Sequence, residues 1–217
     1  MTGFRRFSPL SALLAMSVMV AVVVAANILV QYPVMGMLGP INLADILTWG
    51  AFTYPAAFLV NDLTNRRFGP AAARKVVIVG FAVAVILSIW LATPRIAIAS
   101  GSAFLFAQLL DVAIFDRLRL QAWWKAPVIS SLVGSFLDTV LFFSLAFASV
   151  FAPVFGFDEA FATETAPLLG AFAIEVPRWV SWALGDYVVK IFVATALLAP
   201  YRVLLAVFGL KADPAAA

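Results

Sequence analysis

The sequence predicts an all-α protein that crosses a membrane several times. Of its 217 residues, 65% are apolar and only 12% are charged, whereas soluble domains contain about 45–50% apolar and about 25% charged residues. The apolar residues also form long uninterrupted runs, which favours helices over the alternating pattern of a membrane β-barrel. A chain of this size could not hide so much apolar surface from water. The composition therefore excludes an ordinary soluble enzyme and a disordered chain.

Six apolar runs are close to the length of about 20 residues that a spanning helix needs. They occupy positions 9–31, 43–60, 73–93, 95–115, 127–151 and 182–208. The first run follows Arg5 and Arg6 but is too long for a signal-peptide core, and no clear small-residue cleavage site ends it, so we expect it to be retained. Pro94 predicts the turn between the third and fourth runs. We expect residues 1–217 to form a single six-helix transmembrane domain.

One longer segment, 152–181, separates the last two runs. Its charged residues are mostly acidic: Asp158, Glu159, Glu164, Glu175 and the single basic residue Arg178. Its apolar piece 166–174 is too short to span a bilayer. We therefore expect an extracytoplasmic excursion with a re-entrant or interfacial part.

The basic residues predict the orientation. With the N-terminus in the cytoplasm, only Arg95 and Arg178 fall on the outer side, and Lys190 lies within the last run. The other eleven basic residues then face the cytoplasm: Arg5, Arg6, Arg66, Arg67, Arg74, Lys75, Arg117, Arg119, Lys125, Arg202 and Lys211. This asymmetry is typical of cytoplasmic loops and predicts an even number of spans with both termini inside. The net charge of +3 thus reflects topology rather than nucleic-acid binding.

Several kinds of chemistry are excluded by residues that the chain lacks. It has no cysteine and no histidine, which excludes disulfides, thiolate nucleophiles, zinc sites and Ser-His-Asp triads. It also has no G-x-x-x-x-G-K-[ST] motif, so the chain does not itself hydrolyse ATP. We therefore expect no enzymatic activity, no cofactor and no bound metal. The expected surroundings are a lipid bilayer.

Polar residues inside the apolar runs are costly, because an ionised side chain at the centre of a spanning helix costs about 2.5–3.5 kcal/mol. The runs and their ends nevertheless contain Asn27, Gln31, Asp45, Asp62, Gln108, Asp111, Asp138, Asp186 and Lys190. Spacings of three and four place many of them on shared helix faces: Asn27 with Gln31, Gln108 with Asp111 and Phe115, and Ser131 and Ser135 with Asp138. We expect these faces to turn inward around a polar cavity near the membrane midplane.

Each of these groups also has a structural interpretation. Asp186 and Lys190, four residues apart, can form a structural ion pair. Asp62 can face water or cap a turn. Arg95 is either an anchor at the membrane surface or a charge that reaches inward to a carboxylate. The amides and Asp111 can cross-link helices instead of binding a ligand.

Six motifs are distributed over residues 27–205. They are NILVQYPV (27–34), TWGAFTYPAAFLVNDLTNRRFGPAAARK (48–75), RIAIAS (95–100), QLLDVAIFDRLR (108–119), WWKAPVISSLVGSFLDTVLFF (123–143) and GDYVVK (185–190). In this order and spacing they resemble the queuosine precursor transporter family, also called vitamin uptake transporters. The resemblance implies import of 7-cyano-7-deazaguanine or 7-aminomethyl-7-deazaguanine across the bacterial inner membrane, after which cytoplasmic enzymes complete queuosine in tRNA.

A flat, guanine-like substrate suggests roles for the polar residues. Its ring N–H and exocyclic amine can both donate to one carboxylate, for which Asp111 or Asp138 is the candidate. Gln108, Asn27 and Gln31 would complete the hydrogen bonding. Trp49, Phe52 or Phe115 would stack on the ring. The candidates for gating or coupling are Asp62, Arg95, Asp186 and Lys190.

Three functions remain open from the sequence. The first is a secondary transporter that works by alternating access. The second is the substrate-binding membrane subunit of an energy-coupling-factor vitamin importer, which uptake by the chain alone would distinguish. The third, a membrane enzyme or assembly factor, has no catalytic constellation to support it. The energy source, the preferred deazaguanine and a homo-oligomeric state are also left open.

Overall fold

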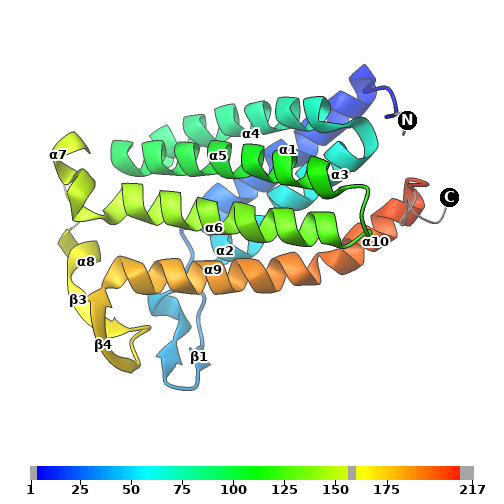
Figure 1. Cartoon of the computed structure of the whole chain (residues 1–217). Helices are drawn as coiled ribbons and strands as arrows, with labels where there is room; N and C mark the ends of the chain where they lie inside the picture. The colour runs from blue at the N-terminus through cyan, green and yellow to red at the C-terminus, as the bar shows by residue number, and fades with distance from the viewer. Residues whose placement is uncertain (1–3, 156–159, 211–217) are drawn as a thin grey trace.

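The structure, a computed structural model, describes residues 4–155 and 160–210. Long helices lie side by side and form an elongated bundle with two small hairpins (Figure 1). Five helical stretches in the described residues are long and apolar enough to cross a membrane: α1 (Pro9–Leu29), α4 (Pro70–Leu91), α5 (Pro94–Leu118), α6 (Lys125–Phe147) and the combined stretch Arg178–Val207. The predicted all-α membrane fold is therefore confirmed, while the count of six spans stays a prediction.

The second predicted span differs from the structure. Instead of one helix over 43–60, a short 3-10 turn (Leu43–Asp45) is followed by α2 (Trp49–Thr53) and α3 (Pro55–Phe68). The segment before α2 is held against the loop that follows α1, because the Trp49 amide donates to the Tyr32 carbonyl at 3.0 Å. The helical part thus begins later and continues further than expected, since its polar end packs inside the bundle instead of meeting water.

Prolines break two of the helices. Pro55 lacks the N–H that would bond to the carbonyl of Ala51, and it separates α2 from α3. The last span is divided into α9 (Arg178–Ala196) and α10 (Leu198–Val207). Pro200 lies four residues after Ala196 and so cannot donate to its carbonyl. Both breaks border the same cavity, described below.

Close packing of small residues holds the bundle together. At Gly80 of α4, a Cβ atom would lie 2.8 Å from Met19 and 2.9 Å from Phe104. At Gly134 of α6, it would lie 2.8 Å from Phe58. Small residues at such points allow membrane helices to approach closely. The largest apolar core lies where α1, α3, α4 and α5 meet.

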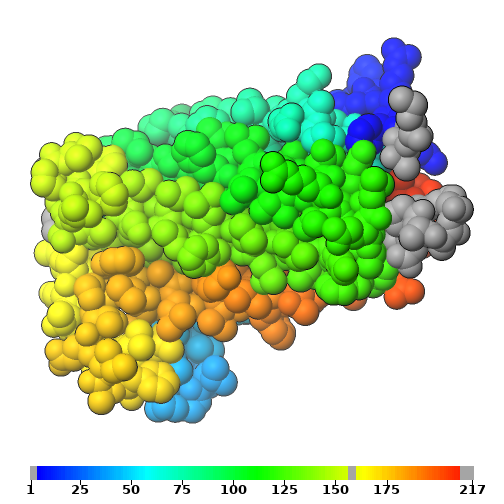
Figure 2. Space-filling model, in the orientation of Figure 1, coloured from blue at the N-terminus to red at the C-terminus, as the bar shows by residue number. Residues whose placement is uncertain are grey.

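The two hairpins project from the bundle (Figure 2). One pairs β1 (Met37–Leu38) with β2 (Ile41–Asn42), and the other pairs β3 (Thr165–Leu168) with β4 (Phe172–Pro177). The second hairpin follows the short helices 3-10 Ser149–Phe151, α7 (Ala152–Phe155) and α8 (Ala160–Thr163). The apolar piece 166–174 therefore forms a hairpin at the end of the bundle and does not re-enter it (Figure 1). Asp158 and Glu159, two of the acidic residues of the predicted excursion, lie outside the described residues.

Basic residues gather at the end where α1 begins and α10 ends. There the Arg5 amide donates to the Arg67 carbonyl, and the guanidinium groups of Arg67 and Arg119 lie over the rings of Phe208 and Phe4. Arg178, in contrast, pairs with Glu164 beside the second hairpin at 3.5 Å. This separation agrees with the predicted charge asymmetry; Lys211 lies outside the described residues. Which end faces the cytoplasm stays a prediction.

Candidate functional site

Polar side chains from four helices turn into the bundle, as the spacing predicts. The buried polar residues of α3, α5, α6 and α9 are Asn61, Asp62, Thr64, Asn65, Arg95, Gln108, Asp111, Ser130, Ser131, Ser135, Asp138, Thr139, Ser181 and Lys190. Because these helices expose apolar residues outward, the buried polar side chains find their partners inside the bundle, in one another and in backbone carbonyls. Most of them gather in two groups.

The first group lies between α3, α5 and α6, and we call it the carboxyl layer: Asn61, Asp62, Gln108, Asp111 and Ser130. Asn61 Nδ2 donates to Asp111 Oδ2 at 3.0 Å and to the Gln108 carbonyl at 3.2 Å. The Ser130 hydroxyl lies 3.4 Å from Asp62 Oδ1. The carboxyl groups of Asp62 and Asp111 lie within hydrogen-bonding reach of each other. Two acids thus meet in a site that is closed to water.

Several polar atoms of this layer are buried and have no hydrogen-bond partner. Both side-chain atoms of the Gln108 amide lack one, and so do Asn61 Oδ1 and Asp111 Oδ1. Buried polar atoms are nearly always paired in folded proteins, and an unpaired one calls for a missing water, ion or ligand. The carboxyl layer is therefore incomplete as it stands.

The second group, the lysine cluster, joins α6, α9 and the break between α2 and α3. Lys190 Nζ lies 2.7 Å from Asp138 Oδ2 and 2.5 Å from Asp186 Oδ2. The Tyr54 hydroxyl donates to Asp138 Oδ1 at 2.9 Å, and the Thr139 hydroxyl donates to Asp186 Oδ2 at 2.8 Å. The expected pairing of Asp186 with Lys190 is present. It is extended by Asp138, whose two oxygens both have partners.

One small cavity lies between α1, α3, α4 and α5. We call it the upper cavity, and its lining includes Asn27, Tyr54, Ser100 and Phe104. Gln108 lies one helical turn beyond Phe104 on the same face of α5. The unpaired Gln108 amide of the carboxyl layer therefore lies one helical turn from a residue that lines the upper cavity.

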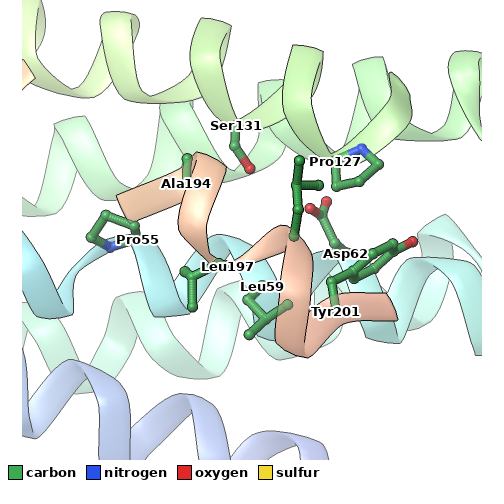
Figure 3. Close-up of a pocket in the computed structure, with 9 residues that line it drawn as sticks. Pro55, Leu59, Asp62, Pro127, Ser131, Ala194, Leu197 and Tyr201 are labelled. Carbon is green, nitrogen blue, oxygen red and sulfur yellow. The ribbon is translucent and has the colours of Figure 1, made fainter. Parts of the chain in front are cut away.

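A second small cavity borders the carboxyl layer at Asp62. This lower cavity is lined by Pro55, Leu59, Asp62, Pro127, Ser131, Ala194, Leu197, Leu198 and Tyr201. In Figure 3 the Asp62 carboxylate points toward α6, and the breaks at Pro55 and Leu197 border the space. Each cavity has only about 10 Å³ of space open to the centre of a water-sized sphere, which is room for about one water molecule, so a heterocycle requires the helices to move apart.

The predicted site residues divide between these places. Asn27 lines the upper cavity and accepts from Ser88 at 3.4 Å. Gln31 is exposed and bonds only back to the Asn27 carbonyl among the described residues. Trp49 is 47% exposed and packs on Phe52 at 5.5 Å.

Two further predicted residues, Phe115 and Arg95, line neither of the described cavities. Phe115 is buried beneath the Arg66 guanidinium, 5.3 Å from its ring centre. Arg95 does not reach a membrane-core carboxylate in its described contacts. It donates to the carbonyls of Leu145 and Ala148 at 2.8 and 2.6 Å, which lie at the end of α6. Arg95 thus caps one helix end.

Sequence reasoning did not single out Tyr54, Asn61, Arg66 or Tyr201. Arg66 donates to the Tyr201 hydroxyl at 3.0 Å and to the carbonyls of Arg119 and Trp123 at 2.7 and 3.3 Å. Tyr201 in turn lines the lower cavity. The four-residue spacing from Asn61 to Asn65 was a usable signal. It was hidden because the predicted span ended at residue 60.

Comparison with known proteins gives consistent matches. A family profile described as "Putative vitamin uptake transporter" matches residues 48–93 and 88–204. A Haemophilus influenzae protein named "Probable queuosine precursor transporter" is 34% identical over 85% of this chain and 82% of its own length. The "Queuosine precursor transporter" of Escherichia coli K12 is 34% identical over 85% and 81%.

A more distant match comes from Bacillus subtilis. Its "Probable queuosine precursor transporter" is 28% identical over 48% of this chain and 58% of its own length. No solved structure gives a significant match. Because the profile matches more than half of the chain and two relatives exceed 30% identity over most of it, this protein belongs to the vitamin uptake transporter family.

Proposed function

We propose that this protein imports a queuosine precursor, 7-cyano-7-deazaguanine or 7-aminomethyl-7-deazaguanine, across the bacterial inner membrane by secondary transport. The names of its relatives support the substrate class. The observation that carries the proposal is the unpaired Gln108 amide, which is buried inside a membrane-type bundle. It lies one helical turn from Phe104 of the upper cavity and in the same polar layer as Asp62 of the lower cavity. An importer of a polar heterocycle needs such unfilled hydrogen-bonding groups between two access routes.

The chemistry of Gln108 suits the polar edge of a deazaguanine. An amide offers one donor group and one acceptor, and a guanine-like edge presents an acceptor carbonyl beside donor N–H groups. In contrast, both oxygens of Asp138 are already bonded, and Asp111 Oδ2 accepts from Asn61. Gln108 is therefore the residue that we propose for substrate pairing, with Asn27 at the far side of the upper cavity.

Aromatic side chains of the upper cavity suit the flat ring. Tyr54 and Phe104 both line it, and their ring centres are 6.1 Å apart in an edge-to-face arrangement. A nucleobase stacked on an aromatic ring gains about 1–3 kcal/mol. We place the ring of the substrate against these two residues rather than against the exposed Trp49.

Alternating access requires that each cavity open in turn. On the upper side, the lysine cluster connects Tyr54 to α6 and α9, so its separation would release the α2–α3 break. On the lower side, Arg66 connects α3 to α10 and to the segment between α5 and α6. We propose these two connections as the opposing gates. Broken helices at Pro55 and Leu197 supply the places at which the helices can bend.

Uptake by cells that lack any deazaguanine importer tests the function. Cells expressing this chain alone should accumulate labelled 7-cyano-7-deazaguanine, and Gln108→Leu should lower the initial rate at least about tenfold, the cost of about 1.4 kcal/mol of binding. Gln121→Leu, at an exposed position, is the matched control and should retain the normal rate. Uptake that requires an added ATPase module would instead support the vitamin-importer subunit. Absence of uptake at normal expression would reject the proposed function.

A further inference from the structure

The contact between Asp62 and Asp111 has a consequence for energy coupling. Asp111 is fully buried and Asp62 is 2% exposed, and their carboxyl groups are within hydrogen-bonding reach. Two ionised carboxylates cannot form a hydrogen bond, because neither carries a proton, and like charges at this separation repel strongly where water is excluded. We infer that Asp62 and Asp111 form a proton-binding site that couples uptake to the transmembrane proton gradient. The inference rests on the transport function proposed above.

An unpaired atom at the same place supports a bound proton. Asp111 Oδ1 is buried and has no hydrogen-bond donor, although Asp111 Oδ2 is satisfied by Asn61. A proton on Asp62 would donate to this free oxygen and would complete the layer. Ser130 lies 3.4 Å from the other oxygen of Asp62 and can hold that carboxyl in place. One proton thus accounts both for the contact and for the missing donor.

The neighbouring cations do not take the place of this proton as a partner of the two carboxyl groups. The nearest cation, Arg66, belongs to the same helix as Asp62, and its three described hydrogen bonds go to Tyr201 on α10 and to the carbonyls of Arg119 and Trp123. From α6, Ser130 faces Asp62, and from α10, the Tyr201 phenol lines the lower cavity together with Asp62. Lys190 on α9 is engaged by Asp138 and Asp186. The pair therefore has no described salt-bridge partner.

The lower cavity gives the proton a route. Asp62 lines this cavity and Asp111 lies behind it, so a water molecule in the cavity can take the proton from the Asp62 carboxyl. The proton then passes from the carboxyl O–H to water. The pair, which carried one negative charge, now carries two. Their repulsion would separate α3 from α5, next to Gln108. Proton release and substrate release are thereby linked through the same two helices.

A cation other than a proton fits less well. Two carboxyl groups within hydrogen-bonding reach of each other are placed to share one proton. In the described part of the chain there is also no group of three or more acids arranged to hold a metal ion. Sodium coupling is therefore the competing outcome that the experiment must exclude.

Purified full-length protein in proteoliposomes tests the inference with labelled 7-cyano-7-deazaguanine, an uncharged substrate. For wild type, an acidic exterior should drive accumulation at least tenfold above equilibrium, a protonophore should abolish it, and a sodium gradient should have no effect. Asp62→Asn replaces the carboxyl group by an amide with a permanent donor and so mimics the bound proton. It should lose pH-driven accumulation but keep counterflow exchange within about twofold of wild type. Asp116→Asn, one turn further along α5 and part-exposed, is the matched control and should change neither.

The outcomes separate the two proposals. Counterflow without pH-driven accumulation in wild type, accumulation driven by sodium, or normal pH-driven accumulation by Asp62→Asn would overturn the coupling site and leave the transport function standing. Absence of counterflow in wild type would reject both. If Asp62→Asn does not fold, as judged by thermal unfolding and gel filtration, Asp111→Asn replaces the other half of the pair. Normal pH-driven accumulation by Asp111→Asn would equally overturn the site.

Discussion

The lysine cluster and the carboxyl layer are both buried polar groups in the same bundle, but they are built differently. In the lysine cluster every charged group has close partners, from Tyr54 and Thr139 to the two carboxylates around Lys190. In the carboxyl layer, Gln108 and Asp111 keep free polar atoms. A hydrogen-bond network in which every group is paired holds the helices in place, whereas one with unpaired groups can still bind a water, an ion or a ligand. The two groups should therefore respond in opposite ways to mutation.

The largest expected effect is on the stability of the lysine cluster. Lys190→Met leaves Asp138 and Asp186 as unpaired buried charges, and removal of one member of a buried ion pair costs about 3–5 kcal/mol. The melting temperature in detergent should fall by on the order of 10 °C. Lys75→Met, at an exposed position, should leave it unchanged. Adding Asp138→Asn to Lys190→Met should recover part of the loss; a further loss would show that the network is not held by charge.

A smaller effect is expected at the Arg66 connection. Lysine cannot reproduce the planar set of donors that reaches Tyr201 and the carbonyls of Arg119 and Trp123. Arg66→Lys should therefore cost about 1–2 kcal/mol and open the lower cavity. Because the chain has no cysteine, a single Ser131→Cys substitution reports this opening directly. Thiol labelling of Cys at this position should become severalfold faster with Arg66→Lys, while Arg74→Lys should leave the rate unchanged.

The carboxyl layer should show the reverse relation between stability and activity. Because the Gln108 amide has no partner to lose, Gln108→Leu removes a buried polar group without breaking a hydrogen bond. The free energy of unfolding should stay the same or rise by up to about 1 kcal/mol, although uptake falls. Thermal unfolding of Gln108→Leu beside Gln121→Leu checks this. A clear loss of stability would mean that Gln108 is a structural cross-link.

Part of this arrangement was predictable from the sequence. Hydropathy and helical spacing identified the bundle, the inward polar faces and the Asp186–Lys190 pair, because these depend on local periodicity. The start of α2 was not predictable, since Leu43 to Thr48 are as apolar as a span but are held by the loop after α1. Nor was the partner of Asp138: Tyr54 reaches it from 84 positions away in the chain.

The same limit explains the aromatic candidates. Trp49 and Phe52 share a face with Asp45 by spacing, but α2 is too short to carry that face into the bundle. Phe115 follows Asp111 by four residues and does point inward, yet it packs beneath Arg66. Local spacing predicts which residues share a face. It does not predict which neighbouring helix covers that face.

The smallest expected effect belongs to a charge pair outside both groups. Asp116 and Arg119 form a contact of 3.2 Å between side chains that are 38% and 19% exposed. Exposed pairs at this spacing contribute about 0.3–0.5 kcal/mol, because water screens the charges and both side chains lose freedom. Asp116→Asn should lower the melting temperature by no more than about 1–2 °C and should leave uptake unchanged. The comparison assumes that burial makes the lysine cluster more important for stability than a surface pair. A loss of stability as large as that of Lys190→Met would contradict this assumption.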